Sequence, residues 1–329
     1  MPIKAIGLLS GGLDSTLAAS LMVAQGIEVH AINFTSPFCQ CTSKNACCAS
    51  VITAVQQLGD LPLKRVFLGD DYLELVGNPR HGYGAGMNPC LDCRIIKIKK
   101  AAAYMREIGA SFIFTGEVLG QRPMSQHKRA LQIIDKESGI ADIILRPLSA
   151  LHFSPTLPER EGWVDRNKLL SISGRSRKEQ IHLAQEKGIM EYPCPAGGCL
   201  LTDKNFAERL KDYFLFTPKP SIKDMALLKT GRHFRLEGGD KVIVSRNEEE
   251  GDRLIELHQQ DDYLLVPGNF SGPVVVLQGQ DIKMAVKKLL FYTRKFPSEK
   301  LFIECTYQGQ SFRINPEANN FPSGQAQSA

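Results

Sequence analysis

The chain has 329 residues, of which 43% are hydrophobic and 23% are charged. This balance excludes an intrinsically disordered or collagen-like chain, and the length predicts two domains of about 100–200 residues each. The net charge of +5 is compatible with a polyanionic partner but does not by itself indicate that the partner is a nucleic acid.

The sequence carries no pattern of a membrane protein. No apolar run approaches the ~18–20 residues that a membrane-spanning helix needs. Residues 1–4 lead directly into a strand-like segment rather than into a signal peptide. We therefore expect a cytoplasmic protein without a membrane partner, whereas its oligomeric state stays open.

Short apolar runs alternate with amphipathic stretches through the first two-thirds of the chain. We predict strands over residues 4–9, 28–34, 63–68, 111–114 and 143–148, and helices over residues 15–25, 46–58, 91–108 and 177–187. This alternation is typical of a mainly parallel sheet with helices on both faces. Residues 1–200 are therefore predicted to form an α/β domain.

The pattern changes after Cys199. Pro218 and Pro220 indicate a linker, which we place over residues 201–230. Residues 231–315 are predicted to form a small α+β domain: a hairpin (232–237 and 241–245), a helix, further strands, a helix over 281–292 and a last strand over 301–307. Residues 316–329, rich in Asn, Ser, Gln and Gly, are predicted to be a disordered tail.

A glycine-rich hexapeptide joins the first predicted strand to the first predicted helix. Its residues are Ser10, Gly11, Gly12, Leu13, Asp14 and Ser15. Two glycines let the backbone approach a phosphate, while backbone N–H groups, the helix dipole and the serine hydroxyls attract it. We therefore predict a pyrophosphate site. Asp14 would repel a bare phosphate, so it either bridges to Mg²⁺ or caps the helix.

The hexapeptide resembles the PP-loop of the ATP pyrophosphatase family. Members of that family adenylate a substrate oxygen, release pyrophosphate and let a nucleophile displace AMP. The resemblance implies a Rossmann-like fold of the HUP/PP-loop type with ATP and Mg²⁺ as cofactors. Asn33 would then lie beside the adenine and ribose, because ligands of open parallel sheets bind at the carboxyl ends of the strands.

Nine cysteines provide a second source of information. In a chain without an export signal they favour metal, cluster or sulfur chemistry over a disulfide framework. Cys90 and Cys93 form a C-x-x-C at the start of a predicted helix, where the helix N-terminus and the neighbouring Arg94 favour a thiolate. With the distant Cys199 they would suit a [4Fe–4S] cluster, whereas four thiols would suit Zn²⁺.

Residues 88–93, N-P-C-L-D-C, resemble the N-P-x-x-x-C segment of tRNA 2-thiouridylases of the MnmA type. The resemblance places Cys93 and Cys199 at the catalytic cysteines of that family. Cys90 departs from the MnmA pattern and resembles instead the cluster-dependent tRNA thiolases TtuA and TtcA, which implies Cys90, Cys93 and Cys199 as cluster ligands. Without a cluster, Cys199 would carry a persulfide and Cys93 would be its partner thiol. Roles stay open for Cys39, Cys41, Cys47, Cys48 and Cys194.

Residues 115–126 and 146–148 resemble the adenylation domain of ThiI, which takes part in tRNA 4-thiouridine synthesis. Thr115 and Gly116 end a predicted strand at the ligand edge, and Gln121 offers a donor to AMP or to an RNA phosphate. Gln126 and Arg146 have the same potential, although both could equally be surface groups.

Residues 239–254 resemble an NFACT-R-type RNA-associated domain, with Ser245 in place of a glycine. Basic side chains in this region would contact RNA phosphates or form a solvated charged face. They are Arg232, His233, Arg235, Lys241, Arg246 and Arg253.

Together these resemblances imply an ATP-dependent tRNA sulfurtransferase that makes 2- or 4-thiouridine. It would adenylate a uridine carbonyl oxygen and transfer sulfur from an iron–sulfur cluster or a cysteine persulfide, with Cys93, Cys199 and Asp14 as catalytic residues. The expected partners are tRNA and a sulfur donor, either a cysteine desulfurase or sulfide. Two alternatives stay open: a PP-loop ligase or sulfurtransferase acting on a small molecule with cysteine-bound Zn²⁺, and a non-catalytic, nucleotide-regulated RNA-binding protein.

Overall fold

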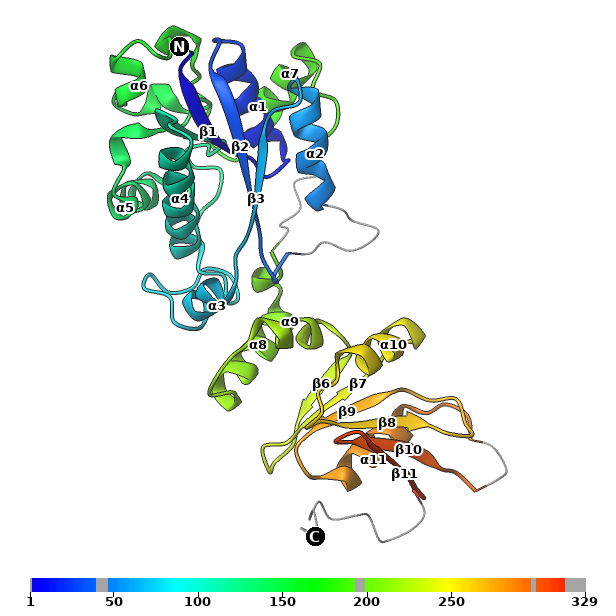
Figure 1. Ribbon diagram of the computed structural model, residues 1–329. Helices are drawn as coiled ribbons and strands as arrows, with labels where there is room; N and C mark the ends of the chain where they lie inside the picture. The colour runs from blue at the N-terminus through cyan, green and yellow to red at the C-terminus, as the bar shows by residue number, and fades with distance from the viewer. Residues whose placement is uncertain (1, 40–46, 193–198, 297–299, 317–329) are drawn as a thin grey trace. The chain divides into compact units, whose positions relative to one another are not determined.

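The computed structural model describes residues 2–39, 47–192, 199–296 and 300–316 (Figure 1). The chain divides into two compact units, Met1–Ala207 and Glu208–Ala329. Each unit has its own sheet and its own hydrophobic core. Within the described part of the chain, no helix combines the length and apolar character needed to cross a membrane.

The first unit is built on five parallel strands in the order β3-β2-β1-β4-β5. They are β1 (Lys4–Leu8), β2 (Glu28–Thr35), β3 (Leu63–Phe67), β4 (Phe112–Thr115) and β5 (Ile144–Leu145). The α/β prediction is confirmed. From β1 the chain adds β2 and β3 on one side of the sheet, and it then crosses to add β4 and β5 on the other side. The strand order therefore reverses between β1 and β4. Open parallel sheets bind their ligands at such a topological switch point.

Helices cover both faces of this sheet (Figure 1). One face carries α1 (Leu13–Val23), α2 (Cys47–Gln57) and α7 (Lys178–Glu186), and the other carries α4 (Cys90–Glu107) and α5 (Lys128–Ser138). Along β4, Phe112 and Phe114 enter the first core and Ile113 enters the second. Burial on both faces explains why the strands read as continuous apolar runs. Helices α3 (Asp70–Gly77), α5 and α6 (Leu157–Arg160) of this unit were not predicted from the sequence.

The second unit contains six antiparallel strands in the order β11-β10-β8-β9-β7-β6. They are β6 (Arg232–Arg235), β7 (Lys241–Val244), β8 (Tyr263–Pro267), β9 (Val275–Gln278), β10 (Ile303–Tyr307) and β11 (Gln310–Ile314). Helix α11 (Ile282–Tyr292) packs on one face, and α9 (Ile222–Lys229) and α10 (Glu248–Leu257) pack on the other. The α+β architecture agrees with the prediction, and β11 is an additional strand paired with β10.

The segment predicted to be a linker, residues 201–230, contains α8 (Lys204–Phe216) and α9. Helix α8 crosses the boundary between the two units. Pro218 and Pro220 lie between the two helices, where the missing proline N–H groups interrupt no helical hydrogen bond. Cys41, Cys194 and the tail 317–329 lie outside the described residues.

Candidate active site

The loop between β1 and α1 is held in shape by its own hydroxyl groups. Ser15 Oγ donates to the carbonyl of Gly12 at 2.9 Å and accepts from the N–H of Ser10 at 3.2 Å. Gly11 has φ +75°, and a Cβ there would lie 2.5 Å from the backbone of Ser50, so only glycine fits. Leu13 is fully buried and anchors the start of α1. The predicted pyrophosphate loop is therefore a closely packed strand-to-helix turn.

Asp14 points toward α7 and does not cap its own helix. Its Oδ2 accepts from Gln121 Nε2 at 2.8 Å and lies 3.8 Å from Nη2 of Arg177. Gln180 Nε2 in turn donates to Gln121 Oε1 at 3.2 Å. Gly12 occupies the N-cap position. The geometry thus disfavours capping by Asp14, and the contributions of Arg177 and Gln180 escaped prediction because no local motif marks them.

The second oxygen of Asp14 provides a test of whether these residues suit a cation. Asp14 Oδ1 is buried and has no hydrogen-bond partner among the described residues. Buried polar atoms are nearly always satisfied, so an unpaired carboxylate oxygen beside a phosphate-type loop suits a bound ion or a ligand donor. Asp14 therefore fits the predicted Mg²⁺ role.

The ends of β2 and β4 contribute two different kinds of group. Asn33 Nδ2 donates to the carbonyl of Leu9 at 2.7 Å, and its buried Oδ1 lacks a partner among the described residues, so it can accept from a ligand. Gly116 lies against the loop: a Cβ there would be 2.5 Å from the N of Ser15. Thr115 is buried and donates to Glu117 Oε2 at 3.2 Å, which directs its hydroxyl toward a buried ion-pair network.

That network is centred on Arg146, which is only 5% exposed and is not a surface group. Arg146 binds Glu117 at 3.1 Å and Asp135 through two bonds of 2.6 and 3.0 Å. Burial opposes its charge, but the two carboxylates raise the pKa of Arg146 above its usual value. Arg146 thus has a structural role beneath the site. Gln126 is also buried.

Tyr72, on α3, lies among three thiols. Its Oη donates to Cys93 Sγ at 3.2 Å. Burial raises the pKa of Tyr72, and the charges of Cys93, Cys199 and Cys39 raise it further, so the hydroxyl remains protonated and can donate. Cys39 and Cys199 face each other in an isolated antiparallel bridge. The structure therefore adds Tyr72 and Cys39 to the predicted pair of Cys93 and Cys199.

Cys90 has different surroundings from the other thiols. It is the first residue of α4, near Arg94 and Arg122. Burial raises the pKa of Cys90 and Cys93 raises it further, whereas the two arginines lower it. Burial raises the pKa of Cys199 to about 11, so Cys199 rests as a neutral thiol near pH 7.

The predicted cluster site requires three thiols that can reach one metal centre. Thiolate donors as such suit iron or zinc. However, no group of three or more Cys, His, Asp or Glu side chains in residues 2–39, 47–192, 199–296 and 300–316 is spaced to hold one metal ion. The trio of Cys90, Cys93 and Cys199 is therefore not a preformed metal site. The predictions for Cys41 and Cys194, and for the side chains of Cys47 and Cys48, fall outside what the structure describes.

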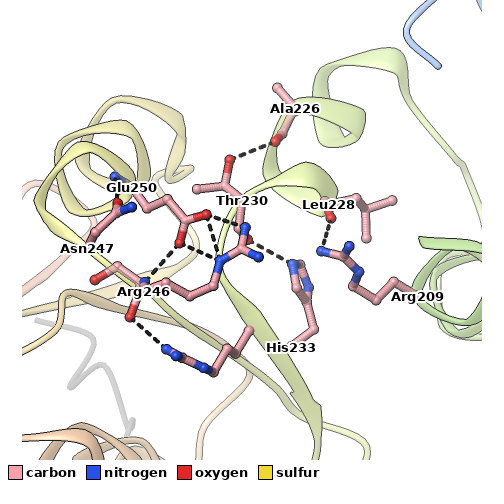
Figure 2. Close-up of polar contacts among 10 residues, drawn as sticks. Arg209, Ala226, Leu228, Thr230, His233, Arg246, Asn247 and Glu250 are labelled. Atoms are coloured by element: carbon pink, nitrogen blue, oxygen red, sulfur yellow. Dashed lines mark hydrogen bonds and ion pairs between the residues drawn. The ribbon is translucent and has the colours of Figure 1, made fainter. Parts of the chain in front are cut away.

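In the second unit, several of the predicted phosphate ligands are already paired. Asp212 binds Arg235 at 2.7 Å and Lys241 at 3.0 Å. Arg246 closes onto Glu250 at the start of α10, as Figure 2 shows. These ion pairs stabilise the fold, and they leave fewer cationic side chains free to bind RNA phosphates than the sequence suggests.

His233 is also unsuited to a phosphate. Its Nε2 lies 2.9 Å from the carbonyl of Thr230 (Figure 2), and its Nδ1 is buried without a partner among the described residues. Burial, together with the positive charges of Lys241 and Arg209, lowers the pKa of His233 to about 3. The ring is therefore neutral at physiological pH.

One surface of the second unit combines cations with aromatic rings. We call it the β6–α11 patch, and it consists of Arg232, Phe234, Lys288, Phe291 and Tyr292. Arg232 lies 4.9 Å from the ring centre of Tyr292, and Lys288 lies 4.3 Å from that of Phe234. Phe291 is 76% exposed. Such alternation of rings and cations suits the bases and phosphates of single-stranded nucleic acid.

Comparison with known proteins agrees with this division of the chain. Residues 3–153 match the family model described as thiamine biosynthesis protein (ThiI), and residues 231–328 match the NFACT protein RNA binding domain. A tRNA-specific 2-thiouridylase MnmA of Bradyrhizobium sp. (strain ORS 278) is 30% identical over 139 residues. The chain is therefore similar to ThiI over residues 3–153 and, over 139 residues, to a tRNA-specific 2-thiouridylase of the MnmA type. The chain thus combines a region that matches the ThiI model with a region that matches the NFACT-R model in one polypeptide.

The curated relatives match only part of this PP-loop chain. The Bradyrhizobium alignment covers 39% of the chain and 35% of the relative, so the chain spans about a third of that protein's length. An MnmA of Dichelobacter nodosus is 25% identical over 224 residues, which cover 64% of this chain and 54% of the relative.

Two solved structures also resemble the chain. A 4-thiouridine synthetase in complex with RNA and bound ATP is 21% identical with a TM-score of 0.39, covering 69% of this chain and 52% of that one. The U34-tRNA thiolase NcsA from Methanococcus maripaludis with its [4Fe-4S] cluster is 20% identical with a TM-score of 0.35, covering 71% and 74%. At these TM-scores the similarity adds nothing to the site geometry.

Proposed function

We propose that this chain is an ATP-dependent tRNA sulfurtransferase that makes 2- or 4-thiouridine in the cytoplasm. The Ser10–Ser15 loop holds the pyrophosphate of ATP, with Mg²⁺ bound at Asp14. A uridine carbonyl oxygen attacks the α-phosphate, and pyrophosphate leaves. Sulfur then attacks the activated carbon and displaces AMP, which is a far better leaving group than oxide.

The observation that carries this proposal is the meeting of loop and thiols in the first unit. The PP-loop follows β1, and the charges of Asp14 and Cys90 both act on Arg122. Cys90 begins α4, and Cys93 lies within its first turn beside Tyr72. Nucleotide chemistry and sulfur chemistry therefore share one region of the fold, as adenylation followed by thiolation requires.

We assign the transferable sulfur to a persulfide on Cys199, loaded from the persulfide of a cysteine desulfurase as the donor; sulfide would be the donor only if a cluster iron held it. Cys199 is half-buried, and limited solvent access protects a reactive sulfur from hydrolysis and oxidation. Ligation of a [4Fe–4S] cluster or Zn²⁺ by Cys90, Cys93 and Cys199 is the competing assignment. Iron and zinc analysis of anaerobically purified protein separates it from the persulfide, which mass spectrometry detects as one added sulfur.

The second unit supplies the RNA contact in this proposal. The NFACT-R match and the β6–α11 patch both support binding of tRNA there. Binding through phosphates weakens steeply with salt, whereas stacking on Phe291 does so less. Phe291→Ala should therefore weaken tRNA binding about five-fold or more at every salt concentration, since base stacking contributes about 1–3 kcal/mol.

The test is an assay with ATP, tRNA transcript and a cysteine desulfurase with cysteine, read by nucleoside mass spectrometry and AMP release. We expect one thiouridine isomer, which identifies the 2- or 4-position, and its loss in Cys93→Ser and Cys199→Ser. Cys305→Ala, in the core of the other unit, is the matched control and should retain activity. Full thiolation by both serine variants would overturn the proposal.

The same assay addresses the two other classes of function. AMP and pyrophosphate release that needs no RNA, with zinc in the protein, would indicate a ligase or sulfurtransferase for a small molecule. Binding of tRNA without nucleotide turnover would indicate a non-catalytic RNA-binding protein. The Asp14 carboxylate with an unpaired oxygen beside the PP-loop favours catalysis over a purely RNA-binding function.

A further inference from the structure

Two arginines of the first unit lie close to each other and to Cys90. Arg122 lies in the loop between β4 and α5, and Arg94 lies in the second turn of α4. The charge of Arg94 acts on Arg122, and the charges of both arginines act on Cys90. Like charges that approach each other repel, and a bound anion relieves that repulsion.

The loop of residues 119–126, which carries Arg122, is attached to the PP-loop. The N–H of Gln126 donates to the carbonyl of Arg122 at 3.0 Å, which closes a turn. Gln121, the neighbour of Arg122, donates from Nε2 to Asp14 at 2.8 Å. These bonds place the backbone of Arg122 next to a side chain that contacts the PP-loop.

The same loop also approaches Cys90. A Cβ on Gly84 would lie 3.2 Å from Cγ of Met124 and 3.5 Å from Sγ of Cys90, so Gly84 lies against both side chains. Met124 comes two residues after Arg122 in the loop. The charges of Asp14 and Cys90 accordingly both act on Arg122. Arg122 therefore lies between the phosphate-type loop and a thiol of the sulfur site.

The guanidinium of Arg122 has no partner in the part of the chain that the structure describes. The residue is exposed, and its side chain makes neither a hydrogen bond nor an ion pair there. Burial lowers the pKa of Arg122 and the charge of Arg94 lowers it further, but an arginine stays cationic at pH 7. A cation with five open N–H donors favours an anionic oxygen ligand.

Arg94 is paired along one edge of its guanidinium. Its Nε lies 3.5 Å from Oε1 of Glu117, which is longer than the usual N–H···O distance of about 2.7–3.2 Å. Glu117 is bound more closely by Arg146, at 3.1 Å. The two terminal nitrogens of Arg94 make no hydrogen bond within residues 2–39, 47–192, 199–296 and 300–316. Its side chain is 27% exposed, so these nitrogens can receive a ligand.

We propose that Arg94 and Arg122 form an anion site that binds the phosphate of AMP, both in the adenylated uridine and after AMP has left. This inference rests on the proposed function. A backbone phosphate of tRNA has the same chemistry, but the position favours AMP. The α-phosphate must lie between the pyrophosphate at the PP-loop and the carbon that sulfur attacks, and Arg122 lies in that interval.

The charge at this phosphate changes during the transfer of sulfur. In the adenylated uridine the phosphate is a diester with one negative charge. The attacking sulfur supplies the electron pair of the new C–S bond, and the bond between carbon and the bridging oxygen breaks. Its electron pair stays on that oxygen, which leaves as part of AMP with a second negative charge. Two guanidinium groups beside the phosphate stabilise this charge as it develops.

The site can be tested by nucleotide binding alone, without RNA or a sulfur donor. Calorimetric titration of the full chain compares AMP with adenosine, which lacks the phosphate. Arg122→Gln should weaken AMP binding about ten-fold or more and leave adenosine binding unchanged. Arg122→Lys keeps the charge without the planar fork and should lose less affinity for AMP. Arg106→Gln, about 18 Å further along α4, is the matched control and should bind AMP like the parent.

Three results would overturn the proposal. The first is equal AMP affinity of Arg122→Gln and the parent. The second is an equal loss for AMP and adenosine, which indicates a displaced loop rather than a lost phosphate contact. The third is weaker tRNA binding by Arg122→Gln in the absence of nucleotide with unchanged AMP affinity, which assigns the two arginines to an RNA phosphate.

The contribution to turnover is measured in a single cycle at saturating ATP and tRNA. Arg122→Gln should release AMP at least about ten-fold more slowly than the parent, because the developing charge has lost one of its two cations. Arg106→Gln should release AMP at the parent rate. Release by Arg122→Gln at the parent rate would contradict a role in this step. If the parent makes no thiouridine while Arg122→Gln still weakens AMP but not adenosine, the proposed function fails and the anion site stands.

Discussion

Tyr72 donates a hydrogen bond from its phenolic oxygen to the sulfur of Cys93, at 3.2 Å. The two residues come from consecutive helices, α3 and α4. Tyr72 is only 2% exposed, so its hydroxyl has little access to water and depends on this partner. The hydrogen bond therefore holds the sulfur of Cys93 in position against the buried core of the first unit.

We expect Tyr72→Phe to keep the fold, because phenylalanine retains the edge contact with Phe38. The variant loses a donor that stabilises negative charge on sulfur by about 1 kcal/mol, so Cys93 should be alkylated about two- to five-fold more slowly. Peptide mass spectrometry after timed iodoacetamide treatment measures the rate. Tyr83→Phe, which removes a hydroxyl bound to the carbonyl of Val76, is the control. An unchanged Cys93 rate would contradict the expectation.

Gly116→Ala should displace the PP-loop. The new Cβ would lie 2.5 Å from the N of Ser15 and 2.6 Å from the carbonyl carbon of Asp14, and backbone atoms cannot yield as a flexible side chain can. We expect at least a ten-fold loss of ATP affinity, or about 1.4 kcal/mol, by calorimetric titration. At Gly69 a Cβ meets nothing within 4 Å, so Gly69→Ala is the matched control. Equal affinities for the two variants would refute this expectation.

Arg146→Ala should destabilise the first unit by about 3–5 kcal/mol, because it leaves the buried carboxylate of Glu117 without its main partner. Urea unfolding followed by the fluorescence of Trp163, the single tryptophan, measures the change. Arg160→Ala breaks an exposed pair with Asp142 and should leave the unfolding midpoint nearly unchanged. Similar midpoints for both variants would show that Arg146 has no structural role.

The second unit should lose stability on acidification because of His233. Its pKa is about 3 in the folded chain, below the usual 6.5, so between these values the unfolded chain binds a proton that the folded chain does not. Stability therefore falls as the pH decreases from 6.5 toward 3, by about 2 kcal/mol at pH 5. Hydrogen exchange of the backbone amides in β6 and β7, corrected for the intrinsic exchange rate at each pH, measures this loss of stability. His233→Gln cannot titrate and should reduce this pH dependence; an identical pH profile would exclude His233 as its source.

The features predicted correctly from the sequence are those that depend on short segments. The strand β1, the glycine turn at Gly11 and the helix beginning at Cys90 follow from apolar runs, conformational freedom and spacing. The alternation of strands and helices then leads to the parallel sheet. Tyr72 escaped prediction, although its place just after the third strand, at the carboxyl edge of the sheet, was a usable signal.

The sequence by itself determined the two-unit α/β and α+β architecture, the PP-loop and the presence of several cysteines. These features depend on hydrophobic periodicity and local conformation, which are set by residues close together in the sequence. Only the tertiary structure decided which side chains meet. Cys39 faces Cys199 because Phe38 packs against Tyr72, and Arg235 and Lys241 lose their availability to RNA because both reach Asp212. Such pairings join distant segments through packing and charge, and no pattern along the chain encodes them.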